Sequence, residues 1–331
     1  MTAPRCGESP PPSPVLEVAA LPRSLGPHRV ASLLTHSLNE RGIGARLVEH
    51  PRARGMCNVH LANSSRPLLA LLARRRGCLV TLHDVMARNP HVRRALQPLM
   101  TTVLRRHRVV VHSRHAADLL RGIGYREDVG IVPLVCPVIV PNEATRFDLR
   151  RTLLDDREGP LLVLAGVLKA AKGVVGAVRA AASVPHARIV LMGRIADAET
   201  ARAVDGAPAN VTVLGAADDV RFSHVLAAAD AVLMPRSAFV GESSGPTVMA
   251  HALGTPVAML AAGSAPEYRL PGDLLLPAET PVPELVVEAA RRAWARVADT
   301  PDAQVGRMLD AYSGEFEALG WDLAPARRDE G

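Results

Sequence analysis

The apolar residues of this chain fall into short continuous runs, and each run ends in glycine, proline or a polar residue. Such runs of Val, Ile and Leu without alternation are typical of parallel strands that are buried on both faces. A helix is predicted at 28–42, after a turn around Gly26. The strands predicted in the first half of the chain lie at 15–21, 57–63, 77–84, 108–113 and 129–134.

A second series of apolar runs has the same form. Proline and charge interrupt the pattern at 140–158, which predicts a linker followed by a helix. Strands that alternate with alanine-rich helices in two consecutive sets predict an α/β chain with two doubly wound parallel-sheet domains. The later strands are predicted at 160–166, 187–193, 210–215, 230–235 and 255–260.

These patterns divide the chain into parts. We expect a flexible tail at 1–14, a first domain at 15–145, a second domain at 146–302 and a C-terminal segment at 303–331. A chain of 331 residues is long enough for each domain to bury its own core.

Composition bears on the compartment. The tail is proline-rich and lacks the apolar core of a signal peptide, and no apolar run approaches the roughly 20 residues of a membrane-spanning helix. The cysteines show no CxxC spacing, which is typical of a reduced cytoplasmic protein, and they are Cys6, Cys57, Cys78 and Cys136. We therefore expect a cytoplasmic location.

Charge is distributed unequally along the chain. Residues 1–150 hold 22 arginines against 10 acidic residues, and residues 151–331 hold 17 basic against 23 acidic residues. The basic clusters at 74–76, 93–94 and 105–108 could face nucleic acid or an anionic membrane. We favour a solvated face, or an arginine wall beside an anionic ligand, because the aromatic interleaving of single-strand binders and any helix-turn-helix or zinc-finger pattern are absent from the sequence. We expect no nucleic-acid partner, and a membrane surface stays open as the less favoured alternative.

Two lysines, Lys169 and Lys172, are the only lysines among 39 basic residues, and they lie three positions apart in one loop. A lysine ammonium is a compact point charge on a flexible stem, whereas a guanidinium is a broad planar fork. A phosphate in a tight glycine-lined pocket favours the former. Two solvated lysines on a surface loop are the alternative.

Further polar residues follow the predicted strands of the second half. Gly193 and Arg194 end one strand, and a short polar segment after another strand comes directly before a predicted helix. Its serines and glycine can cap that helix and direct backbone N–H groups toward an anion, although a well-capped helix alone explains them equally. Because ligands bind at the carboxyl ends of parallel strands, this segment and the lysines together predict a diphosphate site. The segment consists of Glu242, Ser243, Ser244 and Gly245.

Further motifs follow one another in a fixed order along the second half, namely Gly166 to Gly173, Gly193, "NVTVLG", "AAADAVLMPRS", "ESSG", "ALGTPVAM" and "APEYRL" with Glu267. The first half contains "VTLHD" with His83 and "VVVHSRHAADLLRGIG" with Ser113. This ordered series resembles the retaining glycosyltransferases of family 4, which have the GT-B fold of two facing Rossmann-like domains. The similarity covers nearly the whole chain, is strongest at about 160–270 and is weaker in the first half.

The resemblance implies roles for individual residues. Lys172 would neutralise the donor diphosphate as charge develops on it, with Lys169 nearby. His83 would contact the transferred sugar, and Glu242 would bind sugar hydroxyls without acting as a nucleophile. The other donor-binding residues that it implies are Gly26, Gly166, Gly193, Arg194, Gly215, Ala216, Ala217, Ser243, Ser244, Gly245 and Thr247. It also implies a cleft between the domains, a link near 140–150 and a C-terminal helix that crosses back to the first domain.

Three family positions differ in this sequence. The arginine of G-R-x4-K-G is Val167, and the paired glycines of the first domain are reduced to Gly26. The second glutamate of the E-x7-E pair, which holds the ribose, falls on Met249 or Ala250 according to the direction of counting. The candidates to replace the missing arginine charge are Lys169, Arg194 and Arg236.

We therefore predict a hexosyl-type glycosyltransferase that moves a sugar from a UDP-, GDP- or dTDP-linked donor to a small-molecule acceptor with retention of configuration. No metal or other cofactor is expected, because the sequence has no His/Cys ligand spacing and in this fold lysine, helix dipole and backbone amides take the role of the metal. The alternatives are a GT-B nucleotide-sugar epimerase and a non-catalytic GT-B partner protein. The pattern indicates neither the acceptor nor the oligomeric state.

Overall fold

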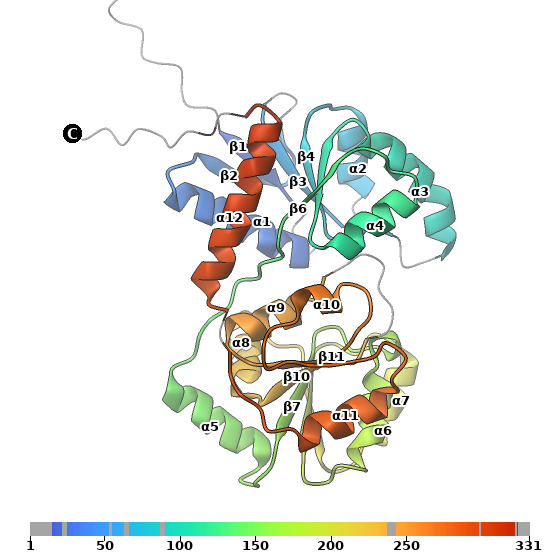
Figure 1. The fold of residues 1–331 in the computed structure, drawn as a ribbon, viewed down its shortest axis with the longest axis vertical. Helices are drawn as coiled ribbons and strands as arrows, with labels where there is room; N and C mark the ends of the chain where they lie inside the picture. Colours follow the sequence, from blue (N-terminus) through green and yellow to red (C-terminus); the bar gives the residue numbers. More distant parts are fainter. Residues whose placement is uncertain are drawn as a thin grey trace, which may run out of the picture.

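The computed structural model of the chain describes residues 15–21, 25–52, 55–62, 66–86, 90–236, 243–297, 299–321 and 323. The tail predicted at 1–14 and residues 324–331 of the predicted C-terminal segment lie outside the described residues. The described chain forms two domains, each built on a parallel sheet with flanking helices, and Figure 1 shows one domain above the other. This confirms the predicted fold class.

The sheet of the first domain has six parallel strands in the order β2-β1-β3-β4-β5-β6. Every residue of β1, β3 and β4 is buried, because helices cover both faces, and most of their residues are therefore apolar. Each also holds buried polar residues, which are Glu17, Asn58, His60 and Thr81. The strands are β1 Leu16–Ala19, β2 Ala45–Val48, β3 Cys57–Leu61, β4 Leu79–Leu82, β5 Arg108–Val111 and β6 Val129–Ile131.

The sheet of the second domain has the order β12-β11-β10-β7-β8-β9, again all parallel. The chain proceeds outward from β7 to β9 and then returns to place β10 on the other side of β7. This reversal makes the β7–β10 pair the topological switch point, where ligands bind in such sheets. The strands are β7 Leu161–Ala165, β8 Arg188–Met192, β9 Val211–Gly215, β10 Ala231–Met234, β11 Val257–Leu260 and β12 Leu274–Leu276.

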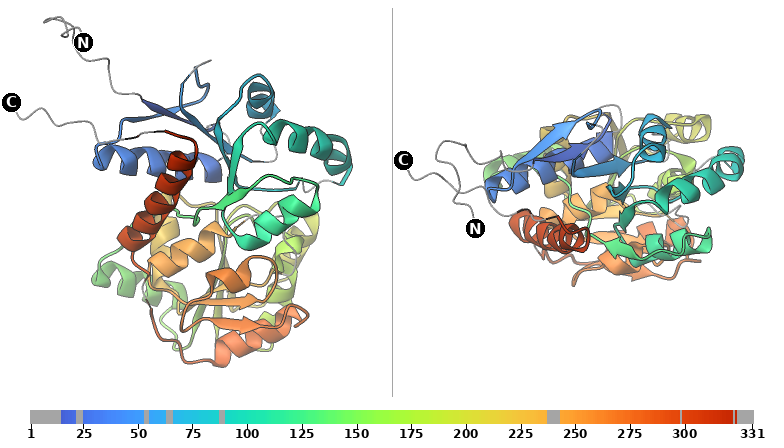
Figure 2. Two further views of the ribbon diagram at one scale, coloured as in Figure 1. Left: turned by 45° about the horizontal axis from the view of Figure 1, so that its top comes forward. Right: turned by 90° about the horizontal axis from the view of Figure 1, so that it is seen from above.

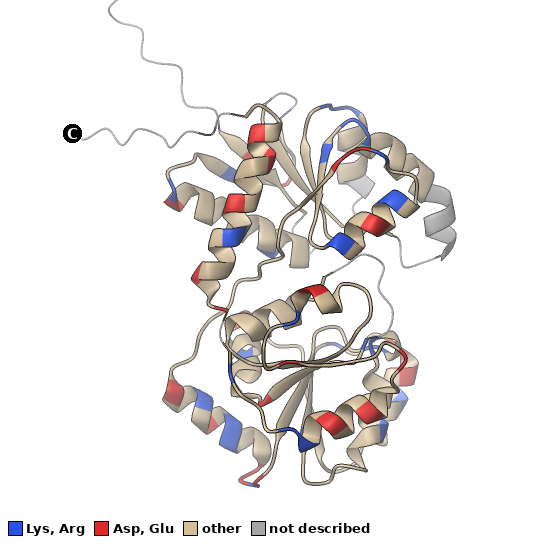
Figure 3. Cartoon of the chain, in the orientation of Figure 1, with Lys and Arg blue, Asp and Glu red and all other residues tan. Residues whose placement is uncertain are grey.

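Helices connect the strands and cover the sheets (Figure 2). Figure 3 shows charged residues on exposed helices such as α5, α11 and α12. Within the described ranges, none of the helices combines the length and the hydropathy needed to cross a bilayer. The helices are α1 Leu25–Glu40, α2 Arg66–Ala73, α3 Pro90–Leu104, α4 Arg114–Gly122, α5 Glu143–Leu154, α6 Val174–Ala181, α7 Ala198–Asp205, α8 Asp219–Ala228, α9 Gly245–Ala252, α10 Ala265–Tyr268, α11 Val282–Arg291 and α12 Pro301–Ala318, with a 3₁₀ turn η1 at Ala170–Lys172.

The sequence analysis misses two strands, β2 and β12, and both lie at sheet edges. β2 has no fully buried residue and includes Arg46, and the three residues of β12 are half-buried. β12 is a run of only three leucines, and Arg46 interrupts β2, so neither reaches the run of about four apolar residues that predicts a strand.

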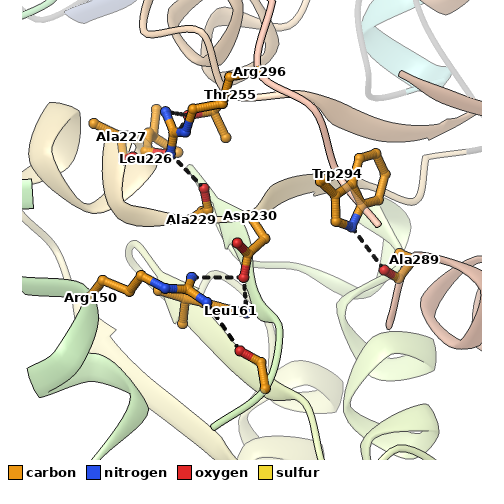
Figure 4. A network of polar contacts seen from close by, with 11 residues as sticks. Arg150, Leu161, Leu226, Ala227, Ala229, Asp230, Thr255, Ala289, Trp294 and Arg296 are labelled. Atoms are coloured by element: carbon orange, nitrogen blue, oxygen red, sulfur yellow. Dashed lines mark hydrogen bonds and ion pairs between the residues drawn. The ribbon is translucent and has the colours of Figure 1, made fainter. Parts of the chain in front are cut away.

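A carboxylate attaches the linker helix α5 to the centre of the second sheet (Figure 4). Arg150 donates from Nη1 to Asp230 Oδ2 at 2.7 Å and from Nη2 to the Gly159 carbonyl at 3.1 Å. The same Asp230 oxygen accepts the Leu161 N–H at 2.7 Å. Asp230 precedes β10 and Leu161 begins β7, so the carboxylate joins both switch-point strands to the helix that leads into the domain.

Arg296 makes a second network near the end of α8 (Figure 4). Its guanidinium donates to the carbonyl oxygens of Ala227, Ala229 and Leu253 and to Thr255 Oγ1. Burial lowers the pKa of Arg296 from its ordinary value, but a guanidinium stays cationic at any physiological pH. A planar fork with five donors suits this cluster of acceptors in a way that a lysine ammonium does not.

Helix α12 begins at the second domain and lies along the first, beside α1 (Figures 1 and 2). Tyr312 OH lies 2.9 Å from Thr81 Oγ1, and Arg108 Nε donates to Glu315 Oε2 at 2.7 Å. The helix therefore completes one face of the first sheet. To the apolar cluster on that face it contributes Met308, Leu309, Tyr312 and Phe316.

We predict that Arg296→Met lowers the free energy of unfolding by about 2–3 kcal/mol, because several partly buried acceptors lose their donor. Arg296→Lys should recover only part of this, since an ammonium cannot reach the same set of acceptors. Urea unfolding measures both. The control is Arg291→Met, on an exposed side chain of α11, which should stay within about 0.5 kcal/mol of the wild type. Equal losses at the two arginines would contradict the role of Arg296.

Candidate functional site

A cavity of about 360 Å³ lies between the two domains, and we call it the interdomain cleft. Its second-domain wall comes from the ends of the switch-point strands β7 and β10 and from the start of α9. Its first-domain wall comes from the start of α1 and from residues that follow β3, β4 and β5. The predicted site residues that line it are Gly26, His83, Lys172, Ser243, Ser244, Gly245 and Thr247.

The loop after β7, residues 166–173, is held by the loop after β8. The Leu168 N–H donates to the Arg194 carbonyl at 2.9 Å. The Ala170 N–H donates to the Asp197 carboxylate at 2.9 Å, and the same carboxylate caps α7. These hydrogen bonds to other protein groups fix the shape of the loop.

Gly173, directly after Lys172, brings the lysine to the strand end. It has a φ of 77°, and a Cβ there would overlap the Pro235 carbonyl oxygen, so only glycine lets η1 approach the end of β10 so closely. The Lys172 side chain extends back over the loop, where a Cβ added to Gly166 would lie 3.6 Å from Nζ. Gly166 thus leaves room for the ammonium group at the end of β7.

The start of α9 presents backbone N–H groups to the cleft. Ser244 caps the helix: its Oγ accepts the Thr247 N–H at 3.4 Å and its carbonyl accepts the Val248 N–H at 3.2 Å. Pro246 has no N–H to satisfy. Within the part of the chain that the structure describes, the Gly245 N–H has no hydrogen-bond partner. This N–H and the helix dipole favour an anion at the position predicted from the sequence.

Several predicted donor-binding residues do not line the cleft. Gly193 is buried, with a φ of 145°, and a Cβ there would overlap the Gly166 carbonyl oxygen, so this glycine serves the close contact of two loops. Gly166 is not part of the lining but lies beside two residues that are, Pro246 and Lys172. The others outside the lining are Lys169, Arg194, Gly215, Ala216 and Ala217.

Of the three residues that could replace the family's arginine charge, Arg236 lines the cleft, whereas Lys169 and Arg194 lie outside its lining. It follows β10 by two residues. Val167, at the family's arginine position, lines the same cleft and is 39% exposed. Two cationic side chains, Lys172 and Arg236, therefore enter the cleft from the ends of neighbouring strands.

The residues at the position of the family's second glutamate lie in the core of the second domain. Met249 and Ala250 are 6% and 0% exposed and pack among residues of β10 and β11. A ribose can contact neither side chain without disrupting that core. The sugar-binding position predicted at Glu242 lies outside the described residues.

Three histidines of the first domain form a hydrogen-bonded chain that the sequence analysis does not predict, and two of them, His83 and His112, line the cleft. His60 Nδ1 lies 3.0 Å from His83 Nε2, and His83 Nδ1 lies 3.2 Å from His112 Nε2. His112 Nδ1 lies 3.0 Å from the Val132 carbonyl oxygen. The only trace in the sequence is a histidine at or just after the end of each of three consecutive strands, β3, β4 and β5.

The Val132 carbonyl at one end of the histidine chain determines which nitrogen of each ring carries the proton. A carbonyl oxygen can only accept, so His112 Nδ1 carries the proton and its neutral Nε2 accepts. By the same argument Nδ1 carries the proton in His83 and in His60. His60 Nε2 is then an acceptor, and Asn58 Nδ2 lies 3.4 Å from it. Each bond in the chain has one donor and one acceptor.

The chain continues to the C-terminal helix. Asn58 Oδ1 accepts from Thr81 Oγ1 at 3.0 Å, so the nearby Tyr312 hydroxyl donates to Thr81. A directed series of hydrogen bonds therefore runs from Tyr312 to Val132 across the first sheet.

This arrangement occupies both ring nitrogens of His83, to which the resemblance assigns a contact with the transferred sugar. Any contact from His83 to a ligand then comes from a ring carbon, unless the bond to His60 or His112 breaks. Burial lowers the pKa of His60 to about 3 and of His112 to about 4, and it holds the pKa of His83 well below 6.5. All three rings are neutral at physiological pH.

Two residues of α10 connect the domains, and Figure 1 shows this helix directly beneath α4. Glu267 accepts the N–H groups of Arg114 and His115 at 2.6 and 2.8 Å, at the first turn of α4. Tyr268 OH donates to the His112 carbonyl at 2.7 Å. The motif series includes Glu267 without this role, and nothing in the sequence singles out Tyr268.

Among the described residues, no group of three or more His, Cys, Asp or Glu side chains is arranged to hold a metal ion. No protein-family model and no curated protein sequence matches the chain.

Solved structures do match it. HepE from Anabaena, solved with UDP and glucose, is similar over 93% of this chain and 99% of its own, with a TM-score of 0.70 and 15% identity. Sucrose-phosphate synthase from Thermosynechococcus elongatus covers 92% of this chain and 100% of its own, with a TM-score of 0.67 and 15% identity. WaaG, a glycosyltransferase of lipopolysaccharide biosynthesis, covers 94% and 100%, with a TM-score of 0.60 and 15% identity. The chain has the GT-B fold of these glycosyltransferases.

We predict that acid destabilises the protein through the histidine chain. In the unfolded state the rings titrate near 6.5, whereas His60 and His112 titrate near 3 and 4 when folded, so the unfolded state binds more protons below pH 6.5. The free energy of unfolding should fall as the pH drops from 6.5 to 4, by up to about 1.4 kcal/mol per pH unit for each histidine. Urea unfolding at several pH values measures this slope.

Variants test whether the histidine chain causes this pH dependence of the free energy of unfolding. His60→Asn and His112→Asn, made separately, should each make the slope shallower. His36→Asn, on an exposed side chain of α1, should leave it as in the wild type. A wild-type slope in both buried variants would contradict the neutral assignment.

Proposed function

We propose that the protein is a retaining glycosyltransferase of the family 4 type, which transfers a hexose from a nucleoside diphosphate sugar to a small-molecule acceptor. The observation that carries this proposal is the convergence of Lys172, Arg236 and the start of α9 at the β7–β10 switch point. Two cations and a capped helix N-terminus at one strand edge suit a diphosphate.

In this proposal the diphosphate lies between Lys172, Arg236 and the Gly245 N–H. Cleavage of the bond to the sugar leaves negative charge on the departing diphosphate. Cations and an N–H that are already positioned stabilise this charge without reorganisation, which is where such sites gain most of their rate. Because Gly173 fixes the direction of Lys172 through backbone contacts, the charge is in position before the donor binds.

Uridine is the first nucleoside to test, because HepE has been solved with UDP-glucose. The ribose of the donor is then held by groups other than the family's glutamate, since Met249 and Ala250 face the core. GDP- and dTDP-sugars complete the panel.

The acceptor enters from the first-domain wall. Among the described residues this wall contains small and apolar groups, the rings of His83 and His112, and the carboxylate of Asp84. Retention follows if the acceptor oxygen attacks the anomeric carbon on the face that the diphosphate leaves, and a phosphate oxygen takes the acceptor proton. His83 and His112 are unsuited to the role of base, because their acceptor nitrogens are occupied by His60 and His83. We propose that the reaction needs no further cofactor and takes place in the cytoplasm.

One observation favours an alternative. The core position of Met249 and the valine at position 167 are what a non-catalytic GT-B partner protein would show. Thermal shifts with UDP, GDP and dTDP, followed by mass spectrometry of products formed from their sugars, separate the two. Stabilisation by one nucleotide and a glycosylated product support the transferase. Stabilisation by none of them supports the partner, and interconversion of the donor sugar alone supports an epimerase.

We predict that Lys172→Ala lowers turnover by about 10²-fold or more, because a preorganised charge at the leaving group is lost. Lys172→Arg should restore only part of the rate, since a guanidinium is bulkier and its charge is more spread. Steady-state kinetics, with the donor that the nucleotide-sugar panel identifies, measures the turnover of both variants.

The matched control is Lys169→Ala, which removes the other lysine of the same loop from outside the cleft lining. It should reduce turnover much less. Thermal unfolding should be nearly unchanged in all three variants, because none removes core volume. Wild-type turnover and nucleotide affinity in Lys172→Ala would contradict the phosphate assignment.

A further inference from the structure

Tyr268 contacts both domains where they meet at the interdomain cleft. Its hydroxyl oxygen lies 2.7 Å from the His112 carbonyl oxygen and 2.6 Å from Ser243 Oγ. His112 and Ser243 line the cleft from opposite walls, and Ser243 comes one residue before the cap of α9. The phenol therefore links the two walls of the cleft directly through hydrogen bonds.

The direction of these hydrogen bonds follows from proton counting. A phenol has one proton, and the His112 carbonyl can only accept, so Tyr268 donates to His112. The short contact to Ser243 then requires the serine to donate to the phenol oxygen. The Ser243 proton is thereby committed to Tyr268, and Ser243 presents only lone pairs to the cleft. Burial raises the pKa of Tyr268, so the phenol keeps its proton at neutral pH.

We propose that Tyr268 sets the hydrogen-bond polarity of Ser243, so that in the closed protein Ser243 accepts a hydrogen bond from a hydroxyl of the donor sugar. The proposal rests on the proposed function. An acceptor at Ser243 suits a sugar hydroxyl and repels a phosphate oxygen, whereas Lys172, Arg236 and the Gly245 N–H suit the phosphate. The polarity of Ser243 thus distinguishes a sugar subsite from the diphosphate subsite beside it.

The same geometry couples this polarity to domain closure. If the domains separate, Tyr268 loses the His112 carbonyl and its proton becomes available to Ser243. Ser243 can then direct its own proton into the cleft, so its character changes from acceptor to donor. Tyr268 is in this sense a positioning residue: it acts on the sugar through Ser243 and through contact between the domains.

The experiment uses UDP-glucose, UDP and the four UDP-glucose analogues in which fluorine replaces one hydroxyl at position 2, 3, 4 or 6. Fluorine cannot donate a hydrogen bond. By calorimetry, the wild type should bind one of these analogues about 10-fold more weakly than UDP-glucose, because a buried acceptor is left without a donor. In Tyr268→Phe that discrimination should shrink to about 2-fold, because the freed Ser243 proton can point toward the fluorine.

Controls separate polarity from stability. Ser243→Ala should also lose the discrimination, and the double variant should lose no more than either single variant. UDP, which lacks the glucose of the donor, should bind all of these proteins within about 2-fold of the wild type. Tyr125→Phe removes another buried phenol hydroxyl, one that donates to the His107 carbonyl away from the cleft, and should keep the wild-type discrimination.

Two outcomes would overturn the proposal while leaving the function intact: equal discrimination in the wild type and Tyr268→Phe, or equal weakening of UDP and UDP-glucose in that variant. A wild type that binds neither UDP nor UDP-glucose would instead contradict the uridine donor, and with it a sugar at Ser243. Urea unfolding of the same four proteins without ligand tests the hydrogen bond separately. Non-additive losses in Tyr268→Phe and Ser243→Ala establish it, and additive losses overturn it.

Discussion

The relation between the two domains depends on a carboxylate, Glu267, that belongs to one domain and caps a helix of the other. The first-turn N–H groups of α4 have no partners within their own helix, and Glu267 supplies an oxygen to two of them. Separating the domains would return both N–H groups and the carboxylate to water. An apolar cluster of Val30, Leu134 and Val248 lies in the same interface. With this contact made, the ends of both sheets face one cavity, and groups on opposite walls can act on one ligand.

Much of the fold could be predicted because burial on both faces leaves a strong trace in a sequence. The inner strands of both sheets are mostly apolar, and the sequence analysis places them almost where the structure does. The edge strands β2 and β12 leave a weaker trace, since Arg46 interrupts the first and the second has only three residues. The GT-B fold itself was predicted from the order of weak motifs along the chain, which the structural similarity to HepE and sucrose-phosphate synthase confirms.

The residues of the site differ in the same way. Local sequence patterns predict some of them, and tertiary contacts determine the place of the others. Lys172 and the start of α9 could be found from the sequence, because a glycine-lined loop and a helix cap are local patterns. Arg236 could be named only as one of three cations, since its place depends on where β10 ends relative to β7. The histidine chain and Tyr268 could not be predicted, because their hydrogen bonds join segments that lie far apart in the sequence. His83 is an example. Its motif is present in the sequence and implies a sugar contact, but both of its ring nitrogens form hydrogen bonds to other histidines of the first domain.

Helix α12 has a consequence for the order of folding. The first domain precedes the second along the chain, yet one face of its sheet is covered by Met308, Leu309, Tyr312 and Phe316, which follow the second domain. Until these residues are synthesised, strands β1, β4 and β5 keep apolar side chains uncovered, and the Thr81 hydroxyl lacks the phenol that completes its hydrogen bonds. The earlier of the two domains is therefore completed only after the later one has been made. Its nascent form therefore exposes an apolar sheet face for as long as translation of the second domain lasts, which is the kind of surface that chaperones bind.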